Sequence, residues 1–264
     1  MARFLRYEKD GTARYGRLED DGETITPLDG TLPDFTDSGD ARVSLGAVRL
    51  LAPIEPTRIV SCGPGFKCSF EDPSQYPAMP AFWHKPLVAL NHHEGVIEIP
   101  DGDYPGINHE VELGIVIGRK AKCVSPQEAG DHIFGYTCYN DVTRGDFYKE
   151  GAFGASPWFV YGKTYEGFAP VGPWVVTGLD TSNLHLECRI NGEVRQSHST
   201  SDRLFAPEQL VSWLSHMGTL NPGDVISCGA PPGMTWMNDG DVCEIEIEGI
   251  GTLRNHIRAR SAKG

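Results

Sequence analysis

The stretch that decides the fold is His109-Glu-Val-Glu-Leu-Gly-Ile-Val-Ile-Gly118. Successive side chains of a β-strand point to opposite faces, so an alternating pattern predicts a strand with its apolar face in the core. The two glutamates then share the other face. The apolar positions of this strand are Val111, Leu113, Ile115 and Ile117, and they alternate with Glu110, Glu112 and Gly114.

Two glutamates on one strand face have two explanations. Alternating charge is common on solvent-exposed strands, and the pattern alone favours an exposed face. Inside a protein, two carboxylates a few ångströms apart raise the pKa of one of them unless a cation relieves the repulsion. A buried pair would therefore indicate a bound divalent cation.

A second segment adds a carboxylate to this pair. Gly135-Tyr-Thr-Cys-Tyr-Asn-Asp141-Val-Thr is rich in β-forming residues and ends in an acidic turn, so it can deliver a third oxygen ligand from a neighbouring strand. Three carboxylates suit a hard ion such as Mg²⁺, Mn²⁺ or Ca²⁺ and leave coordination positions for water and substrate. The candidate metal ligands are Glu110, Glu112 and Asp141.

Strand patterns dominate the rest of the chain as well. Helical patterns are few: one turn at Pro126 to Ala129 and an amphipathic helix at Pro207 to His216. The sequence therefore predicts a mostly β fold of the α+β class. Beyond Pro56, the predicted strands are Arg58 to Ser61, Val96 to Ile99, Val111 to Ile117, His132 to Tyr139, Trp174 to Thr177, His185 to Ile190, Val225 to Ser227 and Asp241 to Ile247.

A small β unit is predicted before the main one. Arg3 to Tyr7, Ala13 to Leu18 and Thr24 to Pro27 are short strand patterns separated by turn signals that contain glycine. A polar stretch from Ser38 to Asp40 follows, and a much longer region begins after it. We place the boundary near residue 50, which gives a small N-terminal β domain over 1–50 and a catalytic domain over 51–264.

Length and composition limit the classes of function. The 264 residues carry a net charge of -13, which argues against nucleic acid as a partner because binding to a phosphate backbone needs a basic face. The chain has no apolar run that could span a bilayer, and its N-terminus becomes charged before any apolar stretch of signal-peptide length. We expect no membrane contact and a cytoplasmic location.

Several further motifs occur in a fixed order along the chain. In this order they resemble the fumarylacetoacetate hydrolase family, and a match by several spaced motifs is far more specific than a single motif. The resemblance implies the family's mixed β-sandwich roll with a small N-terminal β domain, assembled as a homodimer. The motifs are Trp158 with Gly162-Lys163, Pro170-Val-Gly-Pro173, Asn191-Gly-Glu with Gln196 and Thr200, and Leu220-Asn-Pro-Gly-Asp224.

The resemblance also implies a chemistry. The three carboxylates fall on the family's metal-ligand positions, and Lys163 falls on its active-site lysine. The cation, Mg²⁺ or Mn²⁺ or else Ca²⁺, would bind the carboxylate and the neighbouring keto or enolate oxygen of a small 2-oxo acid or β-diketo acid and stabilise developing negative charge. The expected activity is enolate chemistry: C–C bond hydrolysis, decarboxylation or keto–enol isomerisation.

One loop departs from the family pattern. Family hydrolases carry a histidine and a glutamate that activate the attacking water, and this chain has Ser69 and Asp72 at those positions. Both are candidate catalytic residues beside Lys163, although a serine without an adjacent base is a poor proton acceptor. The departure favours decarboxylation or isomerisation over hydrolysis. The other histidines that could replace the missing base are His84, His92 and His93.

The substrate half of the site departs from the family twice more. Ala230 replaces a residue that carries a hydroxyl group in the family. In another family motif the arginine is shifted or lost in this chain, and Arg144 lies in that segment. An alternative hypothesis follows, in which the chain is a catalytically silent family member that binds metal and a small acid without turnover. Met234 is a further loop residue expected to affect specificity, and the candidate substrate-binding residues are Phe66, Lys85, Arg144, Gln196 and Thr200.

Overall fold

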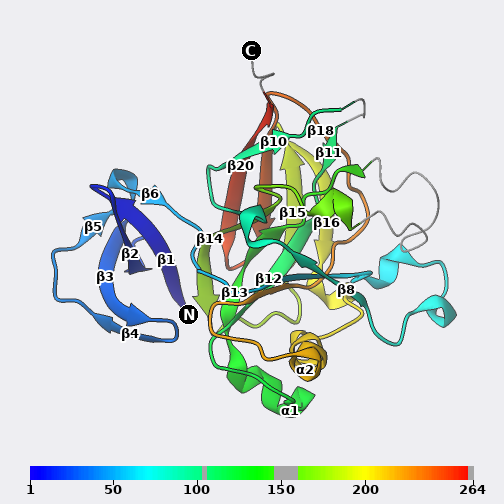
Figure 1. The fold of residues 1–264 in the computed structure, drawn as a ribbon, viewed down its shortest axis with the longest axis horizontal. Helices are drawn as coiled ribbons and strands as arrows, with labels where there is room; N and C mark the ends of the chain where they lie inside the picture. The colour runs from blue at the N-terminus through cyan, green and yellow to red at the C-terminus, as the bar shows by residue number, and fades with distance from the viewer. Residues whose placement is uncertain (103–105, 146–159, 261–264) are drawn as a thin grey trace.

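A long, curled β-sheet runs through the molecule (Figure 1). The structure is a computed structural model and describes residues 1–102, 106–145 and 160–260. The strand order is β4-β3-β2-β1-β14-β13-β12-β17-β7-β8, and short strands β5, β6 and β9 pair with β3, β1 and β14. The N-terminal strands and the strands of the larger unit therefore belong to one hydrogen-bonded sheet.

The N-terminal unit is an antiparallel meander with a small core of its own, built from buried side chains of β1, β2 and β3. Gly11 and Gly22 adopt positive φ in the turns between these strands, a conformation that glycine tolerates without steric cost. The turn signals of the sequence thus mark real turns. The strands are β1 (Ala2–Lys9), β2 (Thr12–Leu18), β3 (Thr24–Thr31), β4 (Asp34–Asp37), β5 (Val43–Ser44) and β6 (Arg49–Leu50).

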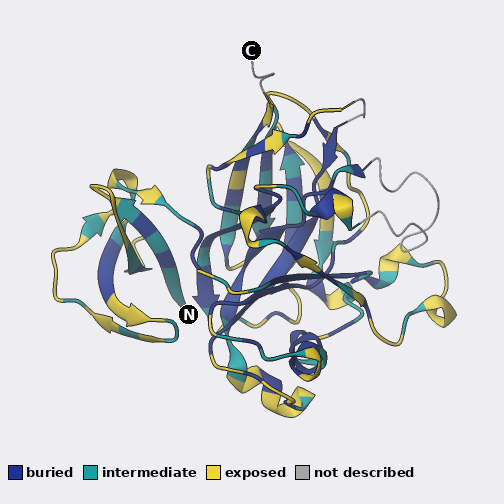
Figure 2. Ribbon diagram, viewed as in Figure 1, coloured by how far each residue is buried: buried dark blue, intermediate teal, exposed yellow. Residues whose placement is uncertain are grey.

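The larger unit continues the sheet from β1. Strand β1 pairs antiparallel with β14, from Ala2 opposite Thr177 to Phe4 opposite Val175. The central strands β12 and β13 are antiparallel, and every residue of β12 is buried, so both faces of this strand are covered (Figure 2). The strands are β7 (Ile59–Gly63), β8 (Ala81–Lys85), β9 (Leu90–Asn91), β12 (Val111–Ile117), β13 (Ile133–Asn140), β14 (Ala169–Thr177) and β17 (Val225–Ser227).

A second sheet, in the order β10-β20-β19-β15-β16, packs against the first. Leu113 and Ile115 of the first sheet share one hydrophobic core with Ile245 and Leu253 of the second. This core covers one face of β12, the strand that carries Glu112. The remaining strands are β10 (Val96–Ile99), β15 (His185–Ile190), β16 (Glu193–Ser199), β19 (Val242–Ile247) and β20 (Gly251–Ala259), with β11 (Ile107–Asn108) pairing β18 (Trp236–Met237).

Helices are short and peripheral in the described residues. The turn α1 (Pro126–Ala129) begins with a capping box between Ser125 and Glu128, and α2 (Pro207–Met217) buries Leu210, Val211 and Leu214 as its apolar spacing predicted. None of the described helices is long and apolar enough to cross a membrane.

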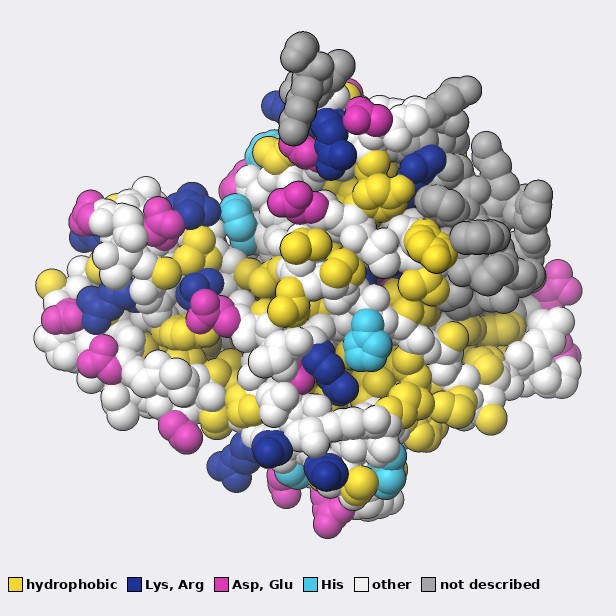
Figure 3. Space-filling model, in the orientation of Figure 1, with side chains coloured by type: hydrophobic (Ala, Val, Ile, Leu, Met, Phe, Trp, Pro, Cys, Tyr) yellow, Lys and Arg dark blue, Asp and Glu magenta, His cyan; other side chains and the backbone are white. Residues whose placement is uncertain are grey.

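The surface toward the viewer is mixed in character. Hydrophobic side chains gather over the middle of the larger unit, whereas Asp, Glu, Lys and Arg side chains are spread mainly around its edges and over the N-terminal unit (Figure 3).

The prediction of a mostly β fold is confirmed, and strands form at all of the predicted sites. Three longer strands, β8, β16 and β20, were not predicted. In β20 the inward-facing row contains Asn255, whose amide donates hydrogen bonds to the carbonyl oxygens of His92 and Gly95, so a polar residue interrupts the apolar alternation.

Candidate metal centre and substrate cavity

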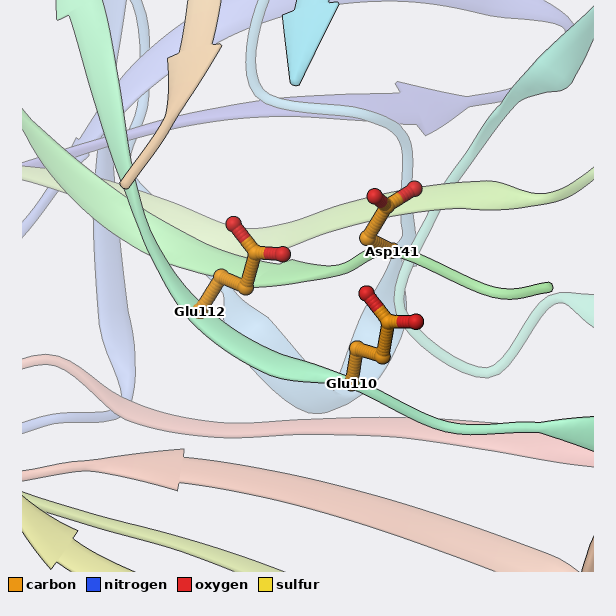
Figure 4. A group of neighbouring side chains, drawn as sticks. All are labelled: Glu110, Glu112 and Asp141. Atoms are coloured by element: carbon orange, nitrogen blue, oxygen red, sulfur yellow. The ribbon is translucent and has the colours of Figure 1, made fainter. Parts of the chain in front are cut away.

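Strands β12 and β13 bring three carboxylates together (Figure 4). Val111 lies opposite Asn140 in the antiparallel register. Glu110 and Asp141 are each one residue outside this pair, so they meet at the open end of the β12–β13 pair. The backbone N–H of Asp141 donates to the carbonyl oxygen of Glu110 at 3.1 Å. One oxygen from each of Glu110, Glu112 and Asp141 lies within 4.8 Å of the other two.

All three carboxylates are buried. Glu112 and Asp141 have no exposed surface, and Glu110 is 5% exposed. The solvent-exposed strand face, which the pattern alone favoured, is therefore excluded. Buried carboxylates need cations or donors to remain charged, because burial in a low-dielectric interior destabilises the ionised form.

Two buried lysines approach the cluster. The Nζ atom of Lys163 donates to Glu110 Oε2 at 2.9 Å, to Asp141 Oδ2 at 2.8 Å and to Thr143 Oγ1 at 2.8 Å. The Nζ atom of Lys85 lies 2.5 Å from Asp141 Oδ1 and also donates to the carbonyl oxygen of Val142. When all three acids are ionised, the two lysines leave one negative charge of the cluster uncompensated.

The lysines act unequally on the three acids. Burial pushes the pKa of Asp141 upward, but Lys163 and then Lys85 outweigh it and hold that pKa below its usual value. Burial raises the pKa of Glu112 well above its usual value, and the charges of Asp141 and Glu110 raise it further. Glu112 is thus the acid whose charge the described side chains compensate least.

Glu112 also has an oxygen without a hydrogen-bond partner among the described residues. Its Oε2 accepts from the backbone N–H of Gly229 at 2.6 Å, while Oε1 is buried and has no partner at hydrogen-bonding geometry. The Ser227 hydroxyl lies near enough to lower the pKa of Glu112, but its effect is smaller than those of burial, Asp141 and Glu110. A buried carboxylate oxygen without a donor is costly, and a cation bound beside it would remove that cost. The hard oxygen donors and the missing positive charge both fit a divalent ion such as Mg²⁺ or Mn²⁺.

A cavity of about 710 Å³ opens beside the carboxylates. Glu110 lies at its floor, and Trp83 forms a wall whose ring centroid is 5.0 Å from Lys163 Nζ. Two loops supply most of the other lining: residues 64–80, between β7 and β8, and residues 228–235, after β17. The lining residues are Cys62, Gly63, Pro64, Ser69, Phe70, Gln75, Pro77, Trp83, Glu110, Ala230, Pro231, Pro232 and Met234.

Of the two loop residues predicted to be catalytic, Ser69 is among the described lining residues and Asp72 is not. Ser69 is exposed at the end of a short 3-10 helix (Lys67–Ser69) and lines the cavity. Asp72 caps the next 3-10 helix (Pro73–Gln75), where its carboxylate accepts from the backbone N–H of Ser74 at 2.7 Å, and it is not among the lining residues. Asp72 holds the loop, and Ser69 has no carboxylate partner there.

The predicted substrate-binding residues are placed around the cavity rather than in its lining. Phe66 is buried in the core, and Lys85 belongs to the carboxylate cluster. The guanidinium of Arg144 donates to the Tyr165 hydroxyl at 2.9 Å. The Thr200 hydroxyl accepts a backbone N–H and donates to a backbone carbonyl oxygen within its own region of the chain.

Gln196 connects the metal strand to the cavity wall. Its Oε1 accepts from the N–H of Val111 at 3.2 Å and from Nδ1 of His109 at 2.9 Å, and its Nε2 donates to the carbonyl oxygen of Pro231 at 2.6 Å. His109 Nε2 accepts from the N–H of Thr235 at 3.2 Å, so the network assigns the proton of this imidazole to Nδ1. Burial lowers the pKa of His109 to about 4, in keeping with a neutral ring.

The alternative histidines do not face the carboxylates. His84 is exposed, because Trp83 and Lys85 occupy the inward face of β8 on either side of it. His92 and His93 line a different cavity, of about 510 Å³, at the junction with the N-terminal unit.

Three contributors to the site were not predicted from the sequence: Trp83, Thr143 and the backbone N–H of Gly229. Thr143 could have been found, since it follows Asp141 by two positions and also donates to Glu110 at 3.2 Å. One residue of the predicted motifs, Trp158, lies outside the described residues.

Comparison with known proteins agrees with the motifs. Residues 65–258 match the fumarylacetoacetate (FAA) hydrolase C-terminal family, and residues 2–53 match a separate N-terminal family, Rv2993c-like. An uncharacterized protein of Methanocaldococcus jannaschii is 39% identical over 207 residues, which are 78% of this chain and 84% of that protein.

Two named proteins are also similar. The mitochondrial oxaloacetate tautomerase fahd2 of Xenopus laevis is 33% identical over 86% of this chain and 74% of its own length. The crystal structure of 5-carboxymethyl-2-hydroxymuconate delta-isomerase from Mycobacterium smegmatis superposes with a TM-score of 0.87 at 34% identity, covering 98% of this chain and 100% of that one. The family match over most of the chain, with the similarity to these proteins, shows that the chain belongs to the fumarylacetoacetate hydrolase family.

Proposed function

We propose that this protein is a divalent-metal-dependent tautomerase of a small 2-oxo acid. In this reaction a proton leaves carbon 3 of the keto acid and a proton is placed on the oxygen of carbon 2, with no water added and no C–C bond broken. The observation that carries the proposal is the buried cluster of three carboxylates and two lysines at the floor of a cavity. The similarity to a tautomerase and an isomerase supports this choice of reaction.

Glu110, Glu112 and Asp141 would hold the cation. When bound, a divalent cation supplies Lewis-acid stabilisation of the enolate oxygen. The residues of the chain then have separate roles. Lys163 holds a positive charge at the cavity edge through its bonds to Glu110 and Asp141, and Lys85 keeps Asp141 ionised from the far side. The ring of Trp83 lies over Lys163 Nζ, and both side chains are buried.

Hydrolysis is less well supported because the described cavity lining lacks a base that could activate water. Its titratable members are Glu110, which belongs to the cluster, and Cys62. Burial raises the pKa of the Cys62 thiol well above its usual value, and the protonated thiol donates to the carbonyl oxygen of Ser227. Ser69 has no such base beside it. Both reactions need proton transfer at carbon, but hydrolysis needs an activated water in addition, so it depends more on the missing base.

The test is a ketonisation assay. Enol forms of phenylpyruvate and oxaloacetate are added to protein that has been stripped with EDTA and then reloaded with Mg²⁺ or Mn²⁺, and the loss of enol absorbance is followed. The proposal predicts metal-dependent ketonisation of at least one acid and no pyruvate release from acylpyruvates. Pyruvate release at a higher kcat than ketonisation would show that the protein is a hydrolase instead. Tight binding of metal and acid without turnover would favour the silent alternative.

A further inference from the structure

The described lining of the cavity contains a single charged side chain. Glu110 is the one carboxylate among the described lining residues, and none of those residues is a lysine, an arginine or a histidine. Ser69 and Gln75, the remaining side chains with polar groups apart from the Cys62 thiol and the Trp83 indole, are neutral. A ligand with its 2-oxo acid head at the Glu110 end therefore places its other end among uncharged groups.

Most of the remaining lining is apolar and comes from two loops. Phe70 and Pro77 come from the loop of residues 64–80, and Pro231, Pro232 and Met234 come from the loop of residues 228–235. The cavity volume, about 710 Å³, falls within the range of sites that hold ligands much larger than a 2-oxo acid head. The site thus has both the room and the surface for an apolar tail.

No described lysine or arginine lines this region of the cavity. Lys85 and Lys163 bind the carboxylate cluster. Arg203 donates through Nε to the carbonyl oxygen of Thr200, and its Nη1 is buried without a partner among the described residues, but neither Arg203 nor Lys67 of the 64–80 loop is a lining residue. A second carboxylate on the ligand would lie against prolines and Phe70 without a described cation to pair with. Burial of an unpaired charge is strongly unfavourable, whereas burial of hydrocarbon is favourable.

We infer that the substrate of this protein is a 2-oxo acid whose far end is an aryl or alkyl group, not a second carboxylate. The inference rests on the proposed function for the position of the head group. It separates this chain from the relative named as an oxaloacetate tautomerase, since oxaloacetate carries a carboxylate at its far end.

Binding tests the tail independently of turnover. N-phenyloxamate and N-oxalylglycine share an oxalyl head that mimics a 2-oxo acid, and they differ in having a phenyl group or a carboxylate at the far end. Calorimetry on the Mn²⁺-loaded protein should give a dissociation constant at least about tenfold lower for N-phenyloxamate. Equal affinities, tighter binding of N-oxalylglycine, or binding of neither compound would overturn the inference.

Turnover then separates this inference from the proposed function. Ketonisation of enol-phenylpyruvate with a kcat/KM at least about tenfold above that of enol-oxaloacetate supports both. If neither enol reacts while N-phenyloxamate binds more tightly than N-oxalylglycine, the tautomerase proposal fails and the inference of an apolar far end is retained. If enol-oxaloacetate is the better substrate, the tail inference fails and the tautomerase proposal stands.

A variant with a positive charge among the lining residues tests the same preference. Met234 lines the cavity and is 40% exposed, so Met234→Lys can fold without burying its new charge. It should lower the preference for N-phenyloxamate over N-oxalylglycine by about tenfold or more. The control is Met217→Lys, at the end of α2 and 60% exposed, which should keep the wild-type preference. An unchanged preference in Met234→Lys would overturn the inference.

Discussion

The carboxylate cluster and the loop of residues 64–80 border the same cavity but are fixed in different ways. The cluster is held by the register of β12 against β13 and by fully buried ion pairs. The loop is held by short 3-10 helices, a local cap at Asp72 and largely exposed residues. A group that must keep its geometry during a reaction is better placed on the sheet than on such a loop. We therefore assign the chemistry to the cluster and specificity to the loops.

The largest effect is expected from Asp141→Asn. This change removes a candidate metal ligand and the shared partner of Lys85 and Lys163, so ketonisation should fall by about 1,000-fold or more. Breaking a buried ion pair by removing one partner costs about 3–5 kcal/mol, and urea denaturation should show a loss of that order. The surface control Asp131→Asn should leave both quantities unchanged. A stable, active Asp141→Asn protein would remove the distinction between cluster and loop.

Lys163→Met should lower kcat by about 100-fold or more, because it removes a preorganised positive charge from the edge of the cavity. Mn²⁺ affinity should remain within about tenfold of wild type, since the three carboxylates are retained. Ketonisation rates and calorimetry on the same preparation measure the two effects. A variant that loses metal binding completely would mean that Lys163 builds the metal site and does not only assist the reaction.

Gln196→Leu tests the connection between the cluster and the cavity wall. It leaves the N–H of Val111 and Nδ1–H of His109 without their shared acceptor, and each buried unsatisfied donor costs about 1–3 kcal/mol. The free energy of unfolding should fall by this order, and KM should rise more than kcat falls because the Pro231 wall shifts. Gln127→Leu on the exposed face of α1 is the matched control. A change in kcat alone would place Gln196 in the reaction instead.

Ser69→Ala should change kcat/KM by less than about threefold, since Ser69 has no base beside it and lies on the exposed loop. The ketonisation assay is again the measurement. A loss comparable to that of Lys163→Met would show that the 64–80 loop takes part in catalysis, so that the chemistry would not be confined to the carboxylate cluster.

The smallest effect lies outside both regions. Burial, more than the opposing charge of Glu94, holds the pKa of His93 below its usual value. The unfolded chain therefore binds more protons at this position as the pH falls below about 6.5, and stability is lost in that window. His93→Asn should make the loss between pH 7 and pH 5 smaller, measured by urea denaturation at both values. His185→Asn, at an exposed histidine, is the control. If His93→Asn and the wild type lost the same stability between pH 7 and pH 5, His93 would not be a source of that loss.

The sequence predicted the cluster because its pattern is local. Alternation along residues 109–118 indicated the strand, and an acidic turn after the next predicted strand supplied Asp141. Lys85 was assigned to substrate instead, because prolines on both sides of Ala81–Lys85 hid strand β8. Once that strand forms, Trp83 and Lys85 share its inward face and reach the cluster.

The cavity wall was harder to predict because its contacts join residues far apart in sequence. His109 and Gln196 are separated by 87 positions, and no local pattern indicates that their side chains meet. Met234 was expected to affect specificity, and it does line the cavity. The apolar character of the wall appears only when the two loops are seen facing each other.

Titration of the stripped protein with Mn²⁺ in a calorimeter, beside Glu112→Gln, tests the central claim most directly. Glu112 has a buried oxygen without a described partner, and glutamine keeps its shape while removing its charge. We predict one ion bound per chain in the wild type and at least about 100-fold weaker binding in the variant. Equal Mn²⁺ binding by the two proteins, or no binding by the wild type, would contradict the assignment of the buried carboxylates as a metal centre.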